Sequence, residues 1–135
     1  PFPIESSLSG VMKTVDVKQR LWYRRSFTAA PAWKGKTVLL HFGAVGWSTE
    51  VFVNGQSVGR HQGGSDPFSL DITGALREQG PQELLVAVVD PTDASTQPRG
   101  KQIRRPEGIW YTPTTGIWQT VWIEPVPRDS IERVK

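Results

Sequence analysis

The sequence predicts an all-β fold, an antiparallel β-sandwich, and three observations lead to this prediction. Short stretches alternate apolar and polar residues with the period of two that is typical of strands. The pair Asn54-Gly55 separates two runs of β-forming residues, and a tight type I′ hairpin prefers this pair because both of its positions need φ > 0. No stretch sustains a helical period, so we expect the strands to follow one another without long helices between them.

The first expected elements lie in the N-terminal half of the chain. "QRLWYRRSFT" at 19–28 has one apolar face, interrupted by Arg25, and an opposite face that carries Trp22. "KTVLLHF" at 36–42 places three apolar residues at alternate positions, and "EVFVNGQSVGRH" at 50–61 is the hairpin. Each of these patterns predicts a strand with one face toward a core.

The later elements are expected to complete two sheets. "DPFSLDIT" at 66–73 predicts a strand that begins after a proline, and "QELLVAVVD" at 82–90 is a short, nearly continuous Val-rich run that predicts a strand buried on both faces. The best helical candidate is a single turn within 71–80, which Thr73 is expected to cap. "GIWQTVWIEP" at 116–125 alternates again and predicts the last strand.

The longest stretch without strand character is 91–115. Loops of this length in compact domains are usually either functional or disordered. A length of 135 residues fits one domain, which we place at 1–127, and "RDSIERVK" at 128–135 reads as a linker toward a following domain. The chain opens without Met, so we expect it to be cut from a longer protein.

Composition excludes several classes of protein. No run approaches the ~20 apolar residues of a membrane span, so no membrane partner is expected. The chain has no cysteine, which excludes disulfides and Cys-based metal sites. Its net charge is +3, but the basic residues are mostly scattered, which argues against nucleic acid as a partner. No signal peptide is visible, and the sequence does not decide between a cytoplasmic, periplasmic or secreted location.

The sequence shows no catalytic constellation, and we predict no catalytic residue, metal or cofactor in this chain. His41 and His61 lack partners at a metal-ligand spacing and are interpreted as structural. Asp90 and Asp93 flank a turn and could approach each other, and sugar hydrolysis needs two carboxyls roughly 5–10 Å apart. An Asp before Pro is more typical of a turn, however.

Two groups of residues near the long loop are candidates for contact with other molecules. The basic residues at positions 99, 101, 104 and 105 are interpreted as solvated charge or as a contact with a neighbouring domain, in preference to a phosphate site. Trp110 and Tyr111 precede a proline in the loop, where they either stack on a sugar or plug the core beneath it. Trp118 and Trp122 are four apart on one strand face and are expected to be structural.

The order of motifs resembles the N-terminal sugar-binding domain of family 2 glycoside hydrolases, which include β-galactosidases, β-glucuronidases and β-mannosidases. The resemblance extends over nearly the whole chain. It is carried by "LWYRRSF" (21–27), "VLLHFGAVGWSTEVFVNGQSVGRHQGG" (38–64), "DPFSLDIT" (66–73), "ELLVAVVDPTD" (83–93) and "GIWQTVWIEP" (116–125).

This resemblance implies a jelly-roll β-sandwich of the galactose-binding-domain-like type. It implies that the parent enzyme continues into an immunoglobulin-like domain and a TIM barrel, and that both catalytic glutamates lie in that barrel. The loop before the Gly-Ile motif would reach toward the sugar site, which makes loop residues the substrate-binding candidates: Arg99, Glu107, Trp110 and Tyr111.

The sequence departs from the family pattern at two places. Relatives usually have a strand around L-N-G-x-W before the segment that matches "PFPIESSLSG", so we expect the first strand of the domain to be missing here. Many relatives also carry a substrate-contacting Asp six residues before the Gly of the Gly-Ile motif. Trp110 stands at that position and Glu107 is the nearest acid, so the role of that Asp is not carried over.

The function expected from the resemblance is a noncatalytic accessory domain of a bacterial glycoside hydrolase that acts on β-linked glycosides such as galactosides. It would brace the catalytic barrel and line the rim of the sugar pocket, with carbohydrate and the other domains of the parent enzyme as its partners. Two alternatives are an independent carbohydrate-binding module and a purely structural sandwich that forms a homo-oligomer.

Overall fold

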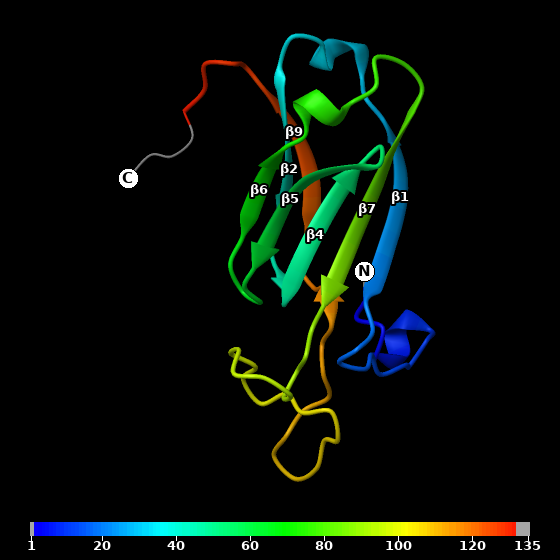
Figure 1. The fold of residues 1–135 in the computed structure, drawn as a ribbon, viewed down its shortest axis with the longest axis vertical. Coiled ribbons are helices and arrows are strands. Elements are labelled where there is room, and N and C mark those ends of the chain that lie inside the picture. Colours follow the sequence, from blue (N-terminus) through cyan, green and yellow to red (C-terminus); the bar gives the residue numbers. More distant parts are fainter. Residues whose placement is uncertain (1, 132–135) are drawn as a thin grey trace.

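The computed structural model describes residues 2–131, which form two antiparallel sheets packed face to face (Figure 1). One sheet has the strand order β1 (Leu21–Thr28), β7 (Pro81–Val89), β4 (Ser48–Val53) and β5 (Gln56–Gln62). The other has the order β6 (Phe68–Asp71), β2 (Thr37–Phe42) and β9 (Val121–Val126). The predicted all-β sandwich is confirmed.

Short elements complete the described chain. β3 (Val45–Gly46) and β8 (Gly116–Ile117) form a two-stranded ribbon, and three single-turn 3₁₀ helices are present: η1 (Ser7–Ser9), η2 (Pro31–Trp33) and η3 (Thr73–Ala75). No helix within residues 2–131 is long and apolar enough to cross a membrane.

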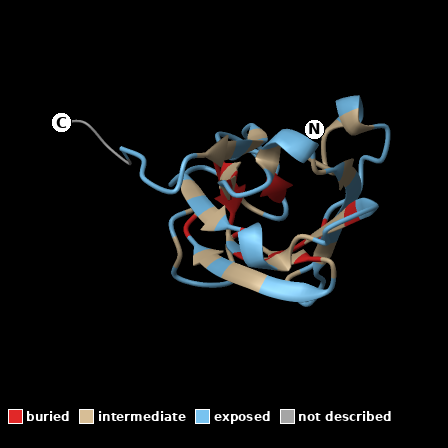
Figure 2. Cartoon of the chain, turned by 90° about the horizontal axis from the view of Figure 1, so that it is seen from above, coloured by how far each residue is buried: buried red, intermediate tan, exposed pale blue. Residues whose placement is uncertain are grey.

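The core lies between the two sheets, where Figure 2 shows the buried residues gathered. Alternate residues of β2, β4 and β7 point inward, which is the period-two pattern that the sequence shows. β7 is buried at three consecutive positions, so the prediction of a strand covered on both faces holds for its C-terminal half. The fully buried inward residues of these strands are Val38, Leu40, Phe42, Val51, Val53, Val86 and Val88.

The hairpin turn is confirmed in its geometry, since Asn54 has φ 52° and Gly55 has φ 83°. The Asn54 side chain also ties the turn to the rest of the fold. Its amide donates to the Ala75 carbonyl at 2.8 Å and to Gln82 Oε1 at 2.7 Å, and its Oδ1 accepts the backbone N–H of Glu83 at 2.9 Å. This side chain therefore joins β4, β7 and η3.

Thr73 does not cap a helical turn, contrary to the prediction. It is the first residue of η3, which has no side-chain cap. Its hydroxyl accepts the backbone N–H of Val38 at 2.8 Å, while Asp71 Oδ1 accepts the backbone N–H of Thr73 at 2.9 Å. The carboxylate of Asp71, placed two residues earlier, holds this turn instead.

The predicted last strand is broken into two. β8 pairs with β3, whereas β9 pairs with β2, so residues 118–120 carry the chain from one neighbour to the other. Trp118 is 43% exposed at this break, and Trp122 is 44% exposed on the outer face of β9. The expected structural role would require cover on both faces of the strand, but the described residues leave both tryptophans partly exposed.

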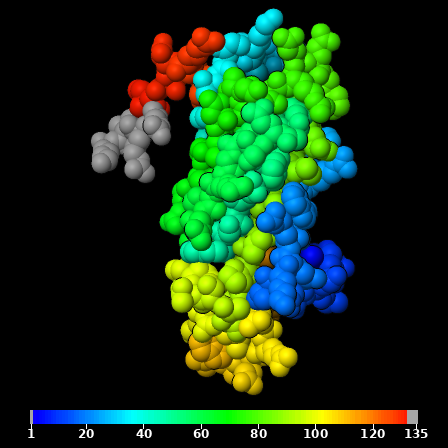
Figure 3. Space-filling model, in the orientation of Figure 1, coloured from blue at the N-terminus to red at the C-terminus, as the bar shows by residue number. Residues whose placement is uncertain are grey.

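Each end of the sandwich has its own set of connections (Figure 1). The segment 91–115 and the N-terminal segment lie at one end, where they form adjoining lobes (Figure 3), and η2, η3 and the segment after β9 lie at the other. Along one side, β1 and β9 are edge strands, and a groove of about 760 Å³ between them reaches core residues Leu40, Phe42 and Val86.

Gly116 joins the loop end of the sandwich to β1. The hydroxyl of Tyr23 accepts the backbone N–H of Ile117 at 3.1 Å. Gly116 has φ 95°, and a Cβ at this position would overlap the Tyr23 hydroxyl. Glycine is therefore required at this position of the Gly-Ile motif for two reasons: its backbone conformation and the close approach of the Tyr23 side chain.

We predict that Gly116→Ala lowers the free energy of unfolding more than Gly80→Ala does. Gly80 has φ 82° with open space around it, so its substitution costs only the left-handed conformation, about 1–2 kcal/mol. The overlap at Gly116 should add about 1–3 kcal/mol. Urea denaturation of both variants checks the difference, and equal losses would show that the Tyr23 contact does not constrain this position.

Candidate functional site

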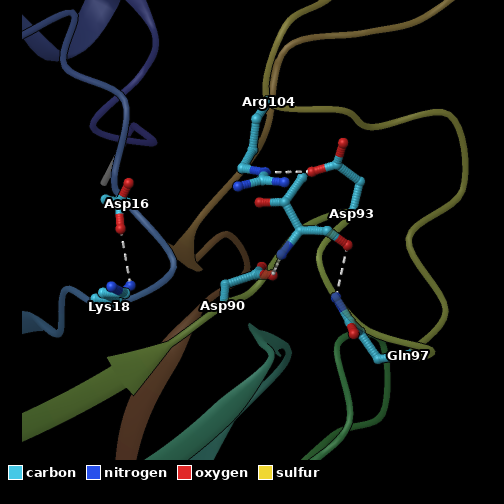
Figure 4. Close-up of polar contacts among 7 residues, drawn as sticks. Asp16, Lys18, Asp90, Asp93, Gln97 and Arg104 are labelled. Atoms are coloured by element: carbon cyan, nitrogen blue, oxygen red, sulfur yellow. Dashed lines mark hydrogen bonds and ion pairs between the residues drawn. The ribbon is translucent and has the colours of Figure 1, made fainter.

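The long loop, residues 91–115, is folded on itself and fixed at both ends. Beyond β7, Asp90 Oδ1 accepts the backbone N–H of Thr92 at 2.8 Å, and Gln97 Nε2 donates to the Thr92 carbonyl at 2.6 Å (Figure 4). Before β8, the carboxylate of Glu5 accepts the backbone N–H of Thr115 at 3.2 Å. The loop thus holds a defined shape between two anchored ends.

Bonds within the loop bring its two halves together. The Tyr111 N–H donates to the Lys101 carbonyl at 2.8 Å, and the Tyr111 carbonyl accepts the N–H of Ile103 at 3.1 Å. Gln102 Oε1 accepts the backbone N–H of Thr114 at 2.6 Å. This pairing lays the basic half of the loop along its aromatic half.

This pairing places a basic side chain over the face of each of two aromatic rings. The guanidinium of Arg99 lies 5.5 Å from the ring centroid of Trp110, and the ammonium of Lys101 lies 5.9 Å from that of Tyr111. Trp110 is 37% exposed and Tyr111 is 63% exposed. Of the two roles that the sequence left open for these residues, plugging the core is therefore excluded.

The other loop candidates occupy different positions. Glu107 is exposed near the tip of the loop, where its carbonyl accepts the N–H of Trp110 at 3.0 Å. Arg104 pairs with Asp93, Nε to Oδ1 at 2.6 Å. Of the four predicted substrate-binding residues, Arg99 and Trp110 contact each other. Tyr111 is the next residue in the chain, and Glu107 is the first residue of the turn that leads to both rings.

Arg99 also lines a cleft of about 380 Å³ at the base of the loop, which sequence reasoning did not find. Four segments that are distant in the sequence form its walls, so no spacing pattern could reveal it. The residues with side chains of chemical interest are Trp47, Ser65, Asp90, Thr92, Arg99, Gln102, Thr114 and Trp118.

Asp90 and Asp93 are engaged with different partners. Figure 4 shows Asp90 at the end of β7, bonded to the turn that it begins, and Asp93 directed at Arg104. Burial raises the pKa of Asp90, and the hydrogen bond from the Thr92 N–H opposes this only in part. The hydrogen bond from Arg104 lowers the pKa of Asp93. The two carboxyls are thus held by separate partners.

Both histidines have structural environments, in agreement with the interpretation from sequence. The ring of His41 stacks on Trp122 at 4.7 Å and its Nδ1 lies 2.7 Å from Ser69 Oγ, while the ring of His61 stacks on Phe68 at 4.1 Å. Among residues 2–131, no three His, Asp or Glu side chains are grouped closely enough to hold a metal ion.

We predict that Asp90→Asn raises the melting temperature at pH 7. The folded-state pKa of Asp90 lies above the unfolded value of about 3.9, so the folded protein binds this proton more tightly than the unfolded chain does. The stability of the parent chain therefore falls as pH rises through the interval between these two pKa values, and is then constant. Asn keeps the acceptor for the Thr92 N–H but carries no charge to desolvate.

Melting curves of both proteins between pH 3 and pH 7 check this prediction. The advantage of the variant should vanish at the acidic end, where Asp90 is protonated in both states. Asp71→Asn is a matched control, because Asp71 is exposed and accepts the N–H of Thr73 in the same kind of turn. A variant at Asp90 that melts below the parent at pH 7 would contradict the prediction.

Comparison with known proteins agrees with this architecture. Residues 2–123 match the family model described as "Glycosyl hydrolases family 2, sugar binding domain". The chain is 34% identical over 114 residues to a β-galactosidase of Thermoanaerobacter pseudethanolicus, covering 83% of this chain and 14% of that protein. It is also 34% identical over 102 residues to a β-galactosidase of Bacteroides ovatus, covering 76% of this chain and 10% of the relative.

Solved structures give the same result. A β-glucuronidase of Bacteroides uniformis superposes with a TM-score of 0.65 at 33% identity, covering 78% of this chain and 12% of that one. A β-glycosidase of Bacteroides vulgatus superposes with a TM-score of 0.60 at 30% identity, with 77% and 12% covered. The chain spans no more than about a seventh of the length of these proteins. The fold, the motif order and these matches together show that the chain belongs to the sugar-binding domain family of the family 2 glycosyl hydrolases.

Proposed function

We propose that this chain is a noncatalytic accessory domain of a bacterial glycosidase that acts on β-linked glycosides, and that its long loop lines the rim of a sugar pocket completed by a catalytic barrel. The observation that carries the proposal is the pair of exposed, cation-covered rings of Trp110 and Tyr111 on a folded loop. Relatives are named as β-galactosidases and β-glucuronidases, which supports this substrate class.

The chemistry of the two rings suits contact with a sugar. Aromatic faces stack on the C–H faces of pyranose rings, and both side chains are exposed at the end of the sandwich. Arg99 and Lys101 restrict the rings from one side and bring N–H donors beside them. Glu107 adds an exposed carboxylate near the turn, where it would accept a hydrogen bond from a sugar hydroxyl.

Hydrolysis itself is assigned to residues outside this chain. A glycosidase needs an acid and a second carboxylate that face the same bond, roughly 5–10 Å apart. Asp90 is held by the turn at Thr92, and Asp93 is held by Arg104, so neither is presented for this task. The contribution of the domain is then the orientation of the sugar.

The remaining exposed apolar surfaces fit contacts with the rest of the protein. The groove between β1 and β9 reaches the buried core beside two unpaired strand edges, and we propose that a preceding strand of the longer protein fills it. The face with Trp122 and His41 would pack on a neighbouring domain and so brace the barrel. Residues 128–131 leave the sandwich at the end opposite the long loop, in keeping with a linker, and 132–135 lie outside the described residues.

We predict that Trp110→Ala and Tyr111→Ala lower kcat/KM of the full-length enzyme by roughly 2- to 10-fold each, which corresponds to a lost ring contact of about 0.5–1.5 kcal/mol. The melting temperature should change little, because both side chains are exposed. Steady-state kinetics and thermal melting of the same preparations separate these effects.

Trp22→Ala is the matched control for these variants. Trp22 is 51% exposed and lies 5.8 Å from the guanidinium of Arg20, so it repeats the arrangement of Trp110 and Arg99 on the outer face of the four-stranded sheet. It should leave kcat/KM unchanged. If neither loop variant differs from this control, the loop does not line the sugar pocket.

We also predict that Trp122→Ala destabilises the full-length protein more than the isolated 135-residue chain. In the chain alone this ring is already 44% exposed, so its removal loses little buried area. If a neighbouring domain covers this ring in the full-length protein, the substitution also removes an interface contact there. Paired melting curves check this, and equal shifts in both proteins would argue against bracing through this face.

A further inference from the structure

We propose that the cleft at the base of the long loop is a second carbohydrate site, which binds one neutral pyranose unit with residues of this chain alone. It adjoins the ring pair through Arg99, but it opens between the strand ends and needs no residue from a catalytic barrel. The accessory role proposed above therefore does not require it, and each can fail without the other.

The dimensions and construction of the cleft suit a small ligand. Its volume of about 380 Å³ falls within the range of roughly 300–1,000 Å³ that is usual for small-molecule sites. Half of its lining residues belong to the long loop, which is held by the hydrogen bonds described above, and the others come from the β3–β4 corner, the turn after β5, the end of β7 and the break after β8. Such walls keep a site in one shape, which lowers the entropic cost of binding.

Trp118 is fixed in a position suited to stacking. Its indole Nε1 donates to the carbonyl of Gly64 at 2.8 Å, which holds the ring plane, yet the residue remains 43% exposed. Trp47 lies close to the same glycine, since a Cβ at Gly64 would lie 3.8 Å from its ring. A buried hydrogen-bonded tryptophan would be a core residue, whereas a fixed and exposed one presents an apolar surface to a ligand.

Asp90 supplies a carboxylate oxygen that no described cation neutralises. Its Oδ1 is occupied by the N–H of Thr92, but no ion pair includes it among residues 2–131. Oδ2 lies beside Gly46, where a Cβ would stand 3.1 Å away and cover it. A half-buried carboxylate without a partner is unfavourable, and a hydroxyl donor from a ligand would relieve this.

The other polar groups complete a pattern for hydroxyl groups. Gln102 uses Oε1 for the N–H of Thr114, and its Nε2 makes no hydrogen bond within the described chain, so an amide donor remains for a ligand. Arg99 contributes guanidinium donors at the same cleft. Asp90 disfavours an anion and Arg99 disfavours a cation, so the cleft as a whole favours a neutral polyhydroxylated ring.

The test uses the full-length protein after its catalytic pocket has been blocked by a covalent, mechanism-based glycoside inactivator. Methyl β-galactoside, methyl β-glucoside and methyl β-glucuronide are titrated in turn, with saturation-transfer NMR and tryptophan fluorescence as readouts. We expect weak, millimolar binding of at least one neutral glycoside, and weaker binding of the glucuronide because of the Asp90 charge. Tighter binding of the glucuronide would overturn the assignment to neutral sugars, and no binding of any probe would overturn the site.

Asp90→Asn and Asp71→Asn are compared in the same blocked protein. The first should weaken binding by about tenfold or more, since it removes a charged acceptor but keeps the bond to Thr92. The second changes an equivalent turn at the far end of the sandwich and should leave binding unchanged. Melting curves confirm that both variants are folded, and unchanged affinity in a folded Asp90→Asn protein would refute the role of this cleft.

Discussion

The bond from the Ile117 N–H to the Tyr23 hydroxyl is the interaction on which the loop end of this domain depends. Tyr23 lies on β1 opposite Val86 of β7, so its hydroxyl is fixed by the same sheet that delivers Asp90 to the start of the loop. The N–H that it receives belongs to β8, where the loop returns. This side chain thus ties β8 to β1, and burial raises the pKa of its hydroxyl.

The two carboxylates at the start of the loop show how environment divides similar residues between tasks. Asp93 is partly buried and bonded to Arg104, so its charge is stabilised and it serves to fold the loop. Asp90 is half-buried without a cation, so its charge is unfavourable in the absence of a ligand. Such a cost to stability is common at sites that bind. The two residues are only three positions apart. Their environments differ because Asp90 directly follows β7, whereas Asp93 lies further along the loop.

The sequence was sufficient to predict the strands and the hairpin because both are local properties. Period-two alternation and the Asn54-Gly55 pair report on backbone geometry within a few residues. The exposure of Trp118 and Trp122 could not be predicted in this way, since alternation shows that two faces differ but not which of them is covered. Tryptophan is usually buried, and here the described residues leave both rings partly exposed. The break after Ile117 likewise depends on a change of pairing partner. The loop candidates Arg99, Glu107, Trp110 and Tyr111 were identified from position and resemblance, whereas the cleft, assembled from four distant segments, left no local pattern to detect.

The exposed aromatic residues of this domain differ in what surrounds them, and this difference separates contacts with ligands from contacts with protein. Trp118 has a fixed indole N–H and lies beside unpaired polar groups, and Trp110 lies under a guanidinium; both environments offer hydrogen bonds to a polar ligand. The groove between β1 and β9 is lined mainly by aliphatic and aromatic core residues, which only another apolar surface can satisfy. Trp122 is intermediate, because it stacks on His41, whose other nitrogen lies 3.3 Å from the carboxylate of Glu124. A flat ring that already has one face covered and polar groups at its edge resembles the margin of an interface more than its centre. Exposed hydrogen-bonding groups therefore lie at the loop end of the domain and the apolar groove lies along its side, so the two kinds of surface fall on different elements of one sandwich.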